Sequence, residues 1–169
     1  MNMAADELYT RFEAWLIDFG PMVGRIASTY EARAALVEEL VQESYMGLWR
    51  ALPSFREEAS AKTFVARITH NVCVSHVRKA VKMPFGELDE HLADNEPRPD
   101  EIAEKASERR VLLEAVRTLS LQGRQIISLH LEGFSNREIG EALGLSEGNI
   151  AVRLTRARTK LKDMIGGTT

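Results

Sequence analysis

Apolar residues recur at helical spacing along almost the whole chain, and this periodicity constrains the fold more than any other feature of the sequence. Near the start, Leu8, Phe12 and Phe19 fall on one helical stripe, and further stripes run through residues 36–52 and 64–77. No segment alternates apolar and polar residues as a half-buried strand would. The sequence therefore predicts an all-α fold.

Prolines and glycines mark the expected ends of these helices. The pair Gly20-Pro21 predicts that the first helix ends there and that another begins, since proline is tolerated at the first position of a helix. The second stripe predicts a long helix that ends before Pro53. The third stripe predicts a helix that runs to about Lys82.

An acidic, proline-containing segment then interrupts the helical pattern. Residues 84–105 hold eight acidic and two basic side chains, together with three prolines. Proline removes a backbone donor and disfavours helix in the residue before it, so we expect an extended linker in which helix resumes near Asp100. The chain is thus predicted to form two small helical domains, residues 1–83 and 106–169, on either side of an acidic linker.

The C-terminal unit carries the signals of two short helices joined by a tight turn. Helices are expected over about residues 107–119 and 120–133. After them, Ser135 and Glu138 match the capping box, in which each side chain satisfies a backbone donor of the other residue. Gly144 stands where a residue in the left-handed conformation ends a helix. This pattern predicts a helix-turn-helix domain.

The last helix, which Ser146 can cap, divides into an apolar face and a cationic face. The apolar face consists of Ile150, Leu154, Ala157 and Leu161, and the cationic face carries Arg153, Arg156 and Lys160. A helix that reads the DNA major groove needs this division, because one side packs inward while the other meets phosphates and base edges. The alternative is an ordinary solvated charged surface, but the caps and the turn upstream favour DNA binding.

The composition excludes several other classes of protein. The 169 residues carry a net charge of −3, and no apolar run is long enough to span a membrane. Cys73 is the one cysteine, which fits a cytoplasmic protein without disulfides. His70, Cys73 and His76 are spaced by three, but the first and last of them point apart on a helix, so we expect no metal site. Without any nucleotide-binding or nucleophile motif, we expect neither a cofactor nor enzymatic activity.

Two segments resemble, in the same order, the second and fourth conserved regions of bacterial sigma factors. Residues 38–80, which contain L-V-Q-E and L-W-R, resemble the second region, and residues 119–164, which contain the helix-turn-helix, resemble the fourth. With only the acidic linker between them, this layout is similar to the extracytoplasmic-function (ECF) group. The resemblance implies a protein that binds core RNA polymerase and directs it to promoters.

The resemblance assigns polymerase binding to the long helix of the second region, which in the family docks on a coiled coil of the largest polymerase subunit. The residues that match are Glu38, Glu39, Gln42, Glu43 and Trp49. Acids on this helix fit a basic partner surface. For Trp49 and Leu48, packing in the protein core is the plainer alternative.

The resemblance also implies that the loop at residues 54–62 and the helix after it hold one strand of the promoter's −10 element. Such capture needs cationic side chains and pockets for flipped bases. The candidates are Arg56, Lys62, Arg67, His70, Asn71, Arg78, Lys79 and Lys82, of which Asn71 is the best candidate for a base contact. A surface or helix-capping amide is the alternative for Asn71. Ala61, Phe64 and Ser75 depart from the family's pattern and leave the −10 preference open.

The helix-turn-helix would read the −35 element as a duplex. Its candidates for groove contacts are Asn149, Val152, Arg153 and Arg156, and its candidates for phosphate contacts are Ser135, Asn136, Arg137, Arg124 and Lys160. Ala151 and Val152 replace the lysine and serine that are common in the family, which predicts an unusual −35 preference.

The expected partners are core RNA polymerase, promoter DNA and an anti-sigma factor, without membrane insertion. Two alternatives stay open at this point. The chain could be a helix-turn-helix regulator that is not a polymerase subunit, since the second half alone also resembles response-regulator DNA-binding domains, or it could be a protein-interaction module. The free protein is expected to bind DNA weakly, because the acidic linker opposes the few cations that face phosphates.

Overall fold

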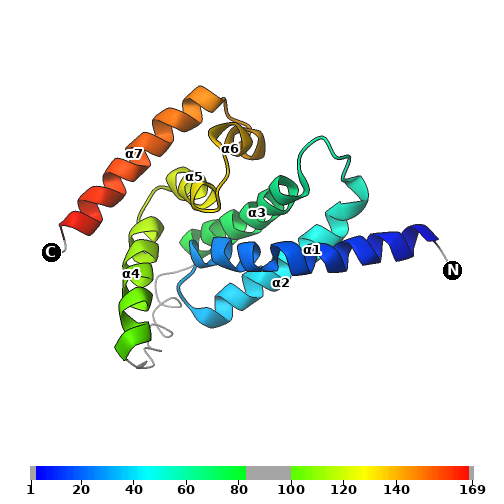
Figure 1. The fold of residues 1–169 in the computed structure, drawn as a ribbon, viewed down its shortest axis with the longest axis horizontal. Helices are drawn as coiled ribbons and strands as arrows, with labels where there is room; N and C mark the ends of the chain where they lie inside the picture. Colours follow the sequence, from blue (N-terminus) through cyan, green and yellow to red (C-terminus); the bar gives the residue numbers. More distant parts are fainter. Residues whose placement is uncertain (1–2, 83–99, 168–169) are drawn as a thin grey trace.

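The computed structural model describes residues 3–82 and 100–167, with side chains for residues 4–81 and 106–167, and every regular element in these parts is a helix (Figure 1). The helices are α1 (Met3–Ser28), α2 (Ala34–Ala51), the 3-10 turn η1 (Leu52–Ser54), α3 (Ala61–Lys82), α4 (Asp100–Arg117), α5 (Leu121–Leu131), α6 (Asn136–Leu143) and α7 (Glu147–Gly166). The predicted all-α fold is confirmed. In the described parts of the chain, no helix combines the length and the apolar character that a membrane span requires.

Helices α1, α2 and α3 pack against one another and form the N-terminal unit. Its interior contains an aromatic cluster around Trp15, whose ring contacts Phe55 and Phe64 edge-on at centroid distances of 5.0 and 6.0 Å. Leu40 and Leu48 contribute the buried face of α2. The predicted end of this helix before Pro53 is confirmed, because Pro53 lies in η1, directly after α2.

The predicted break at Gly20-Pro21 is wrong, because α1 continues through Pro21 to Ser28. Residues after the proline, including Val23 and Ile26, are buried and continue the apolar stripe of the first turns. A side chain before proline would collide with the proline ring in helical geometry, and Gly20 has none. Packing of the buried residues after Pro21 therefore outweighs the cost of an internal proline.

The local signals of the helix-turn-helix are confirmed atom by atom. The Ser135 hydroxyl accepts a hydrogen bond from the Glu138 backbone N–H, and the Glu138 carboxylate accepts one from the Ser135 backbone N–H, at 3.2 and 3.3 Å. Gly144 has φ +71°, in the left-handed region. The Ser146 hydroxyl caps α7 by accepting from Asn149 N–H at 3.2 Å. The predicted apolar face of α7 is buried against α4, α5 and α6.

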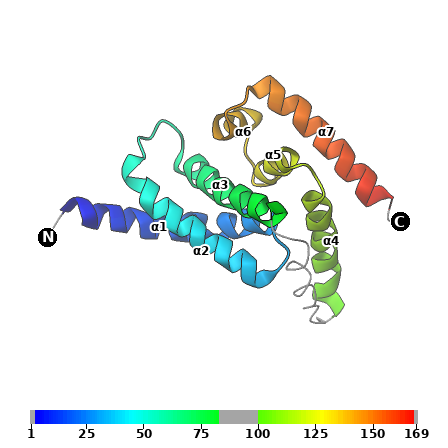
Figure 2. The same cartoon turned by 180° about the vertical axis from the view of Figure 1, so that it is seen from behind.

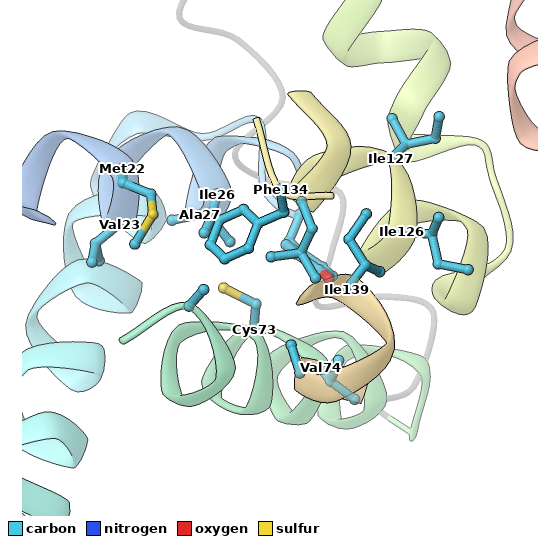
Figure 3. Close-up of a cluster of buried hydrophobic side chains, with 14 of the residues drawn as sticks. Met22, Val23, Ile26, Ala27, Cys73, Val74, Ile126, Ile127, Phe134 and Ile139 are labelled. Carbon is cyan, nitrogen blue, oxygen red and sulfur yellow. The ribbon is translucent and has the colours of Figure 1, made fainter. Parts of the chain in front are cut away.

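Helices α4, α5, α6 and α7 form the C-terminal unit, which packs directly on the N-terminal unit. Figures 1 and 2 show α5 and α6 beside α3, and these helices are in contact. Figure 3 shows Ile26 and Cys73 of the N-terminal unit in one buried cluster with Phe134 and Ile139 of the C-terminal unit. The predicted linker lies mostly outside the described residues, although helix does resume at Asp100 as predicted.

Glu31 ties the turn after α1 to α3 and to the start of α2. Its carboxylate accepts hydrogen bonds from the Arg33 backbone and side chain, at 2.9 to 3.1 Å, and lies 3.0 Å from His76 Nε2. Burial alone would raise the pKa of Glu31, but these hydrogen bonds and the Arg33 charge outweigh it and lower the pKa to about 2. The ionised carboxylate is therefore a stabilising group at neutral pH.

Glycine at position 140 is required by the turn between α6 and α7. A Cβ atom at Gly140 would lie 2.5 Å from the Leu145 carbonyl oxygen, whereas one at Gly148 would meet nothing within 4 Å. We expect Gly140→Ala to lower the free energy of unfolding by about 1–3 kcal/mol. The matched Gly148→Ala should leave it unchanged or raise it by up to about 1 kcal/mol. Urea denaturation followed by circular dichroism measures both, and equal stabilities would contradict this account of the turn.

The lowered pKa of Glu31 predicts how stability depends on pH. A depressed carboxyl pKa contributes stability that is present above the unfolded value of about 4.5 and is lost as the pH falls toward about 2. We expect Glu31→Gln to cost on the order of 2–3 kcal/mol at pH 7 and progressively less between pH 5 and about pH 2. Urea denaturation at these pH values tests this, with the exposed Glu7→Gln as the control that should match the unsubstituted protein throughout.

Candidate functional site

The outer face of α7 presents most of the residues predicted to read a duplex. Asn149, Val152, Arg156 and Lys160 are exposed on this face, and Val152 is 52% exposed although it is apolar. The capped start of α7 fixes the direction of the helix, and the buried opposite face prevents it from rotating. The helix can therefore offer one apolar contact and several cations to a groove.

Arg153 differs from its neighbours because two side chains hold its guanidinium group. Its Nε donates to Asn149 Oδ1, one turn earlier, and its Nη1 donates to Gln122 Oε1 on α5. The α5 N-terminus, the guanidinium and the Lys160 side chain surround one hollow of about 220 Å³. Gln122 is a residue that the sequence analysis missed, because a contact between residues 31 apart has no signal in local spacing.

The start of α6 lies on the surface close to the turn. Ser135 and Arg137 are exposed and Asn136 is half-buried, and Arg137 pairs with Glu141 of the same helix at 3.4 Å. Arg124 is placed differently. Its Nη2 donates to the Arg117 carbonyl at 2.5 Å, and its guanidinium lies 5.7 Å from the centre of the Tyr30 ring. Arg124 is thus engaged within the protein and does not join the predicted phosphate-contacting set in this arrangement.

A second cationic surface follows α3. Arg67, Asn71, Arg78 and Lys79 are exposed along it, while the side chain of Lys82 lies outside the described residues. Beside Arg67, the loop before α3 forms a hollow of about 290 Å³, whose lining includes Phe55, Arg56 and Phe64 together with the acids Glu58 and Glu141. Aromatic rings and arginines are the groups that stack on and neutralise a single strand. Within the loop, Glu57 has φ +59°, a conformation that non-glycine residues seldom adopt.

His70 does not belong to this surface, because it is 1% exposed between the two units. The Ser128 hydroxyl donates to the Gln125 carbonyl, so it accepts from His70 Nε2–H at 3.4 Å, and His70 Nδ1 accepts from the Tyr30 hydroxyl at 2.6 Å. Burial lowers the pKa of His70 to about 3, and the ring is neutral. The prediction that His70 contacts DNA therefore finds no support in this arrangement.

Lys62 lies at the start of α3 but is turned toward the C-terminal unit. Its Nζ donates to the Glu132 carbonyl at 2.9 Å and lies 4.6 Å from the centre of the Phe134 ring. The carboxylate of Glu132 in turn accepts two hydrogen bonds from Arg25. Arg25 and Glu132 are further residues that the sequence analysis missed, since 107 residues separate them.

The outward face of α2 is acidic at one end and apolar at the other. Glu38, Glu39, Gln42 and Glu43 are all exposed. Leu48 is buried, as its core-packing alternative predicted, whereas Trp49 is 43% exposed and packs one edge on Phe12 at a centroid distance of 5.1 Å. Trp49 borders a largely apolar hollow of about 420 Å³ between α1 and α2. An aromatic group beside acids suits a protein interface.

Two family models match the chain in succession. The model described as "Sigma-70 region 2" matches residues 16–82, and the model described as "Sigma-70, region 4" matches residues 109–161. Together they cover most of the chain. The first contains α2, α3 and the second half of α1, and the second contains α5, α6, the second half of α4 and most of α7.

Curated relatives carry related names. The chain is 29% identical over 147 residues to the protein named "Probable RNA polymerase sigma factor RfaY" of Xanthomonas campestris, covering 83% of this chain and 37% of that protein. It is 24% identical over 163 residues to "ECF RNA polymerase sigma factor SigM" of Mycobacterium tuberculosis, covering 96% of this chain and 78% of that protein. The chain thus spans little more than a third of the first relative and most of the second.

Solved structures share the fold over both units. One is CnrH in complex with the cytosolic domain of CnrY, with a TM-score of 0.71 and 23% identity, covering 94% of this chain and 89% of that chain. Another is the sigma factor RpoE of Bartonella quintana in complex with the anti-sigma factor NepR, with a TM-score of 0.73 and 24% identity, covering 92% of this chain and 97% of that chain.

Proposed function

The chain belongs to the ECF group of RNA polymerase sigma factors, and we propose that it binds core RNA polymerase through the outward face of α2 and directs it to promoters. The observation that carries this proposal is the separation of three exposed surfaces on three helices. An acidic face lies on α2, and cationic faces lie on α3 and α7. Each surface suits a different partner, since acids complement a basic protein and cations complement DNA.

The α3 surface would bind the −10 element as a single strand, and the α7 surface would bind the −35 element as a duplex. Arg56, Arg67, Asn71, Arg78 and Lys79 are the −10 residues supported by their exposure, together with the hollow beside Phe64. On α7 the set consists of the exposed Asn149, Val152, Arg156 and Lys160 together with the half-buried Arg153. Residues 1–83 and 106–169 would be the two functional domains, with 84–105 as their linker.

The same proposal covers the setting in which the protein works. As a subunit of the polymerase, it would act in the cytoplasm and would have no enzymatic activity of its own. An anti-sigma factor would hold it inactive. The shared fold supports this, because both similar proteins were solved in complexes with a partner. Such a partner would compete with polymerase for the acids of α2.

Transcription in vitro tests the proposal directly. Purified chain and bacterial core RNA polymerase should together initiate RNA synthesis from promoters selected out of a random DNA pool. Reversing two charges on α2, with Glu39→Lys and Glu43→Lys, should weaken binding to core polymerase roughly tenfold because charge complementarity is lost. The exposed α1 residues Glu7 and Asp18, changed to Lys together, provide a control with the same change in net charge. No initiation with any promoter would refute the function, and equal loss in both double variants would refute the α2 site.

The contact between Arg153 and Gln122 predicts a specific effect on −35 recognition. We expect Arg153→Ala to cost about 1–3 kcal/mol at one base pair of the −35 element. Gln122→Ala should relax the preference at that same base pair, because the guanidinium would lose one of its two side-chain supports. Arg158→Ala, on the exposed flank of α7, should weaken all sequences equally. Binding of polymerase holoenzyme to single-substitution promoters measures these effects, and identical profiles for Gln122→Ala and Arg158→Ala would contradict the positioning role.

A further inference from the structure

Contacts between the two units hold two of the residues that the sequence analysis assigned to the −10 element. Lys62 donates to the C-terminal unit, and His70 is buried against Ser128. The hollow beside Arg67 is lined by Glu58 of the loop before α3 and also by Glu141 of α6, so the C-terminal unit adds a second carboxylate where a DNA strand would enter. In this arrangement, the C-terminal unit thus covers one end of the single-strand surface, at Lys62 and the hollow beside Arg67, while Asn71, Arg78 and Lys79 stay exposed.

Glu132 is an acid in an electrostatically unfavourable place. It caps the C-terminus of α5, where the negative end of the helix dipole repels a carboxylate. Both of its carboxylate oxygens accept hydrogen bonds from Arg25, from Nε and Nη2, each at 2.8 Å. The Glu132 side chain is 10% exposed, whereas the Arg25 side chain is 53% exposed. A two-pronged pair of this kind is the strongest geometry available to arginine, and it joins one unit to the other.

Two cations support this pair by binding helix ends across the same boundary. Lys62 donates to the Glu132 carbonyl, so the α5 C-terminus receives a positive charge from the N-terminal unit. Arg117 returns the contact, because its Nη2 donates to the Ser28 carbonyl at the C-terminus of α1 at 2.7 Å. Cations are favoured at helix C-termini, where carbonyl groups lack partners within the helix.

The closed arrangement is too small to read both promoter elements at once. Elements named −10 and −35 are about 25 base pairs apart, or roughly 85 Å along B-form DNA. A compact chain of this length has a radius of gyration of roughly 15 Å, and is therefore about 40 Å across. The units must separate before the proposed surfaces of α3 and α7 can bind one promoter.

We propose that Arg25, Glu132 and Lys62 form a latch, which holds the two units closed and keeps Lys62 and the hollow beside Arg67, one end of the −10 surface, from DNA until the units separate. The inference rests on the proposed function insofar as the covered surface is taken to bind a single strand. The latch itself rests on the contacts alone. Opening it frees Lys62 for phosphate and moves Glu141 away from the hollow beside Arg67.

Energy transfer between two dyes on the full-length chain tests whether the latch closes the molecule. Dyes are attached at Asp18→Cys on α1 and Asp163→Cys on α7, both exposed positions. Cys73 belongs to the buried cluster between the units, which opening would uncover, so every labelled chain also carries Cys73→Ala. We expect one high-transfer population in the unsubstituted chain, and a low-transfer population that grows roughly three- to tenfold in Arg25→Glu. The swapped pair Arg25→Glu with Glu132→Arg should restore closure.

A single-strand binding assay tests the masking, and here the sign of the effect is decisive. The probe is a fluorescein-labelled, random-sequence DNA strand of about twelve nucleotides. Arg25→Glu makes the protein more acidic, so electrostatics alone predicts a lower affinity for the probe. Release of the latch predicts an affinity that rises at least about threefold. Arg110→Glu supplies the same charge change in a pair confined to α4, and should bind no better than the unsubstituted chain. Circular dichroism checks that each variant remains helical.

The outcomes separate the latch from the function. Unchanged energy transfer in Arg25→Glu would overturn the latch and leave the sigma-factor proposal standing. Opening without tighter probe binding would overturn the masking of the single-strand surface. If the variant opens and binds the probe more tightly but the protein never initiates transcription, the latch is supported and the sigma-factor proposal is refuted.

Discussion

The closed arrangement depends on two helix C-termini that find their donors in the opposite unit. The last carbonyls of an α-helix have no partner within it, and each such group must bind water or another donor. Ser28 at the end of α1 receives Arg117, and Glu132 at the end of α5 receives Lys62. Because each unit completes the other, the apolar cluster around Phe134 is covered from both sides. Separation of the units would expose both helix C-termini and the Phe134 ring to solvent.

The helix-turn-helix could be predicted from the sequence because its determinants act over very short distances. Ser135 and Glu138 satisfy each other within one turn, and Gly144 needs no partner to adopt a positive φ. The buried face of α7 follows from spacing alone. The acids of α2 were assigned from the resemblance, and they share one exposed face because residues three and four positions apart lie on the same side of a helix. Each of these features is set by residues a few positions apart.

Features that depend on distant partners could not be predicted from the sequence. Pro21 signals a helix end locally, yet burial of the residues after it extends α1. His70 and Arg124 look like surface residues beside DNA-binding segments, but each meets Tyr30 at the boundary between the units. Gln122 belongs to the site only because α5 packs against α7. The one local hint of the boundary was Glu132, an acid at the end of a helix where a cation would be favoured.

A latch of this kind also limits how a partner can open it. A ligand shifts an equilibrium between two forms only as far as it binds one form more tightly than the other. The acids of α2 are exposed while the units are closed, so binding to them alone gives polymerase no preference for the open form. Opening must therefore be driven by contacts with groups that closure covers, such as Lys62 or Phe134. Recruitment through α2 and release of the α3 surface are thus separable steps, and a partner that performs the first without the second would hold the protein on the enzyme in an inactive form.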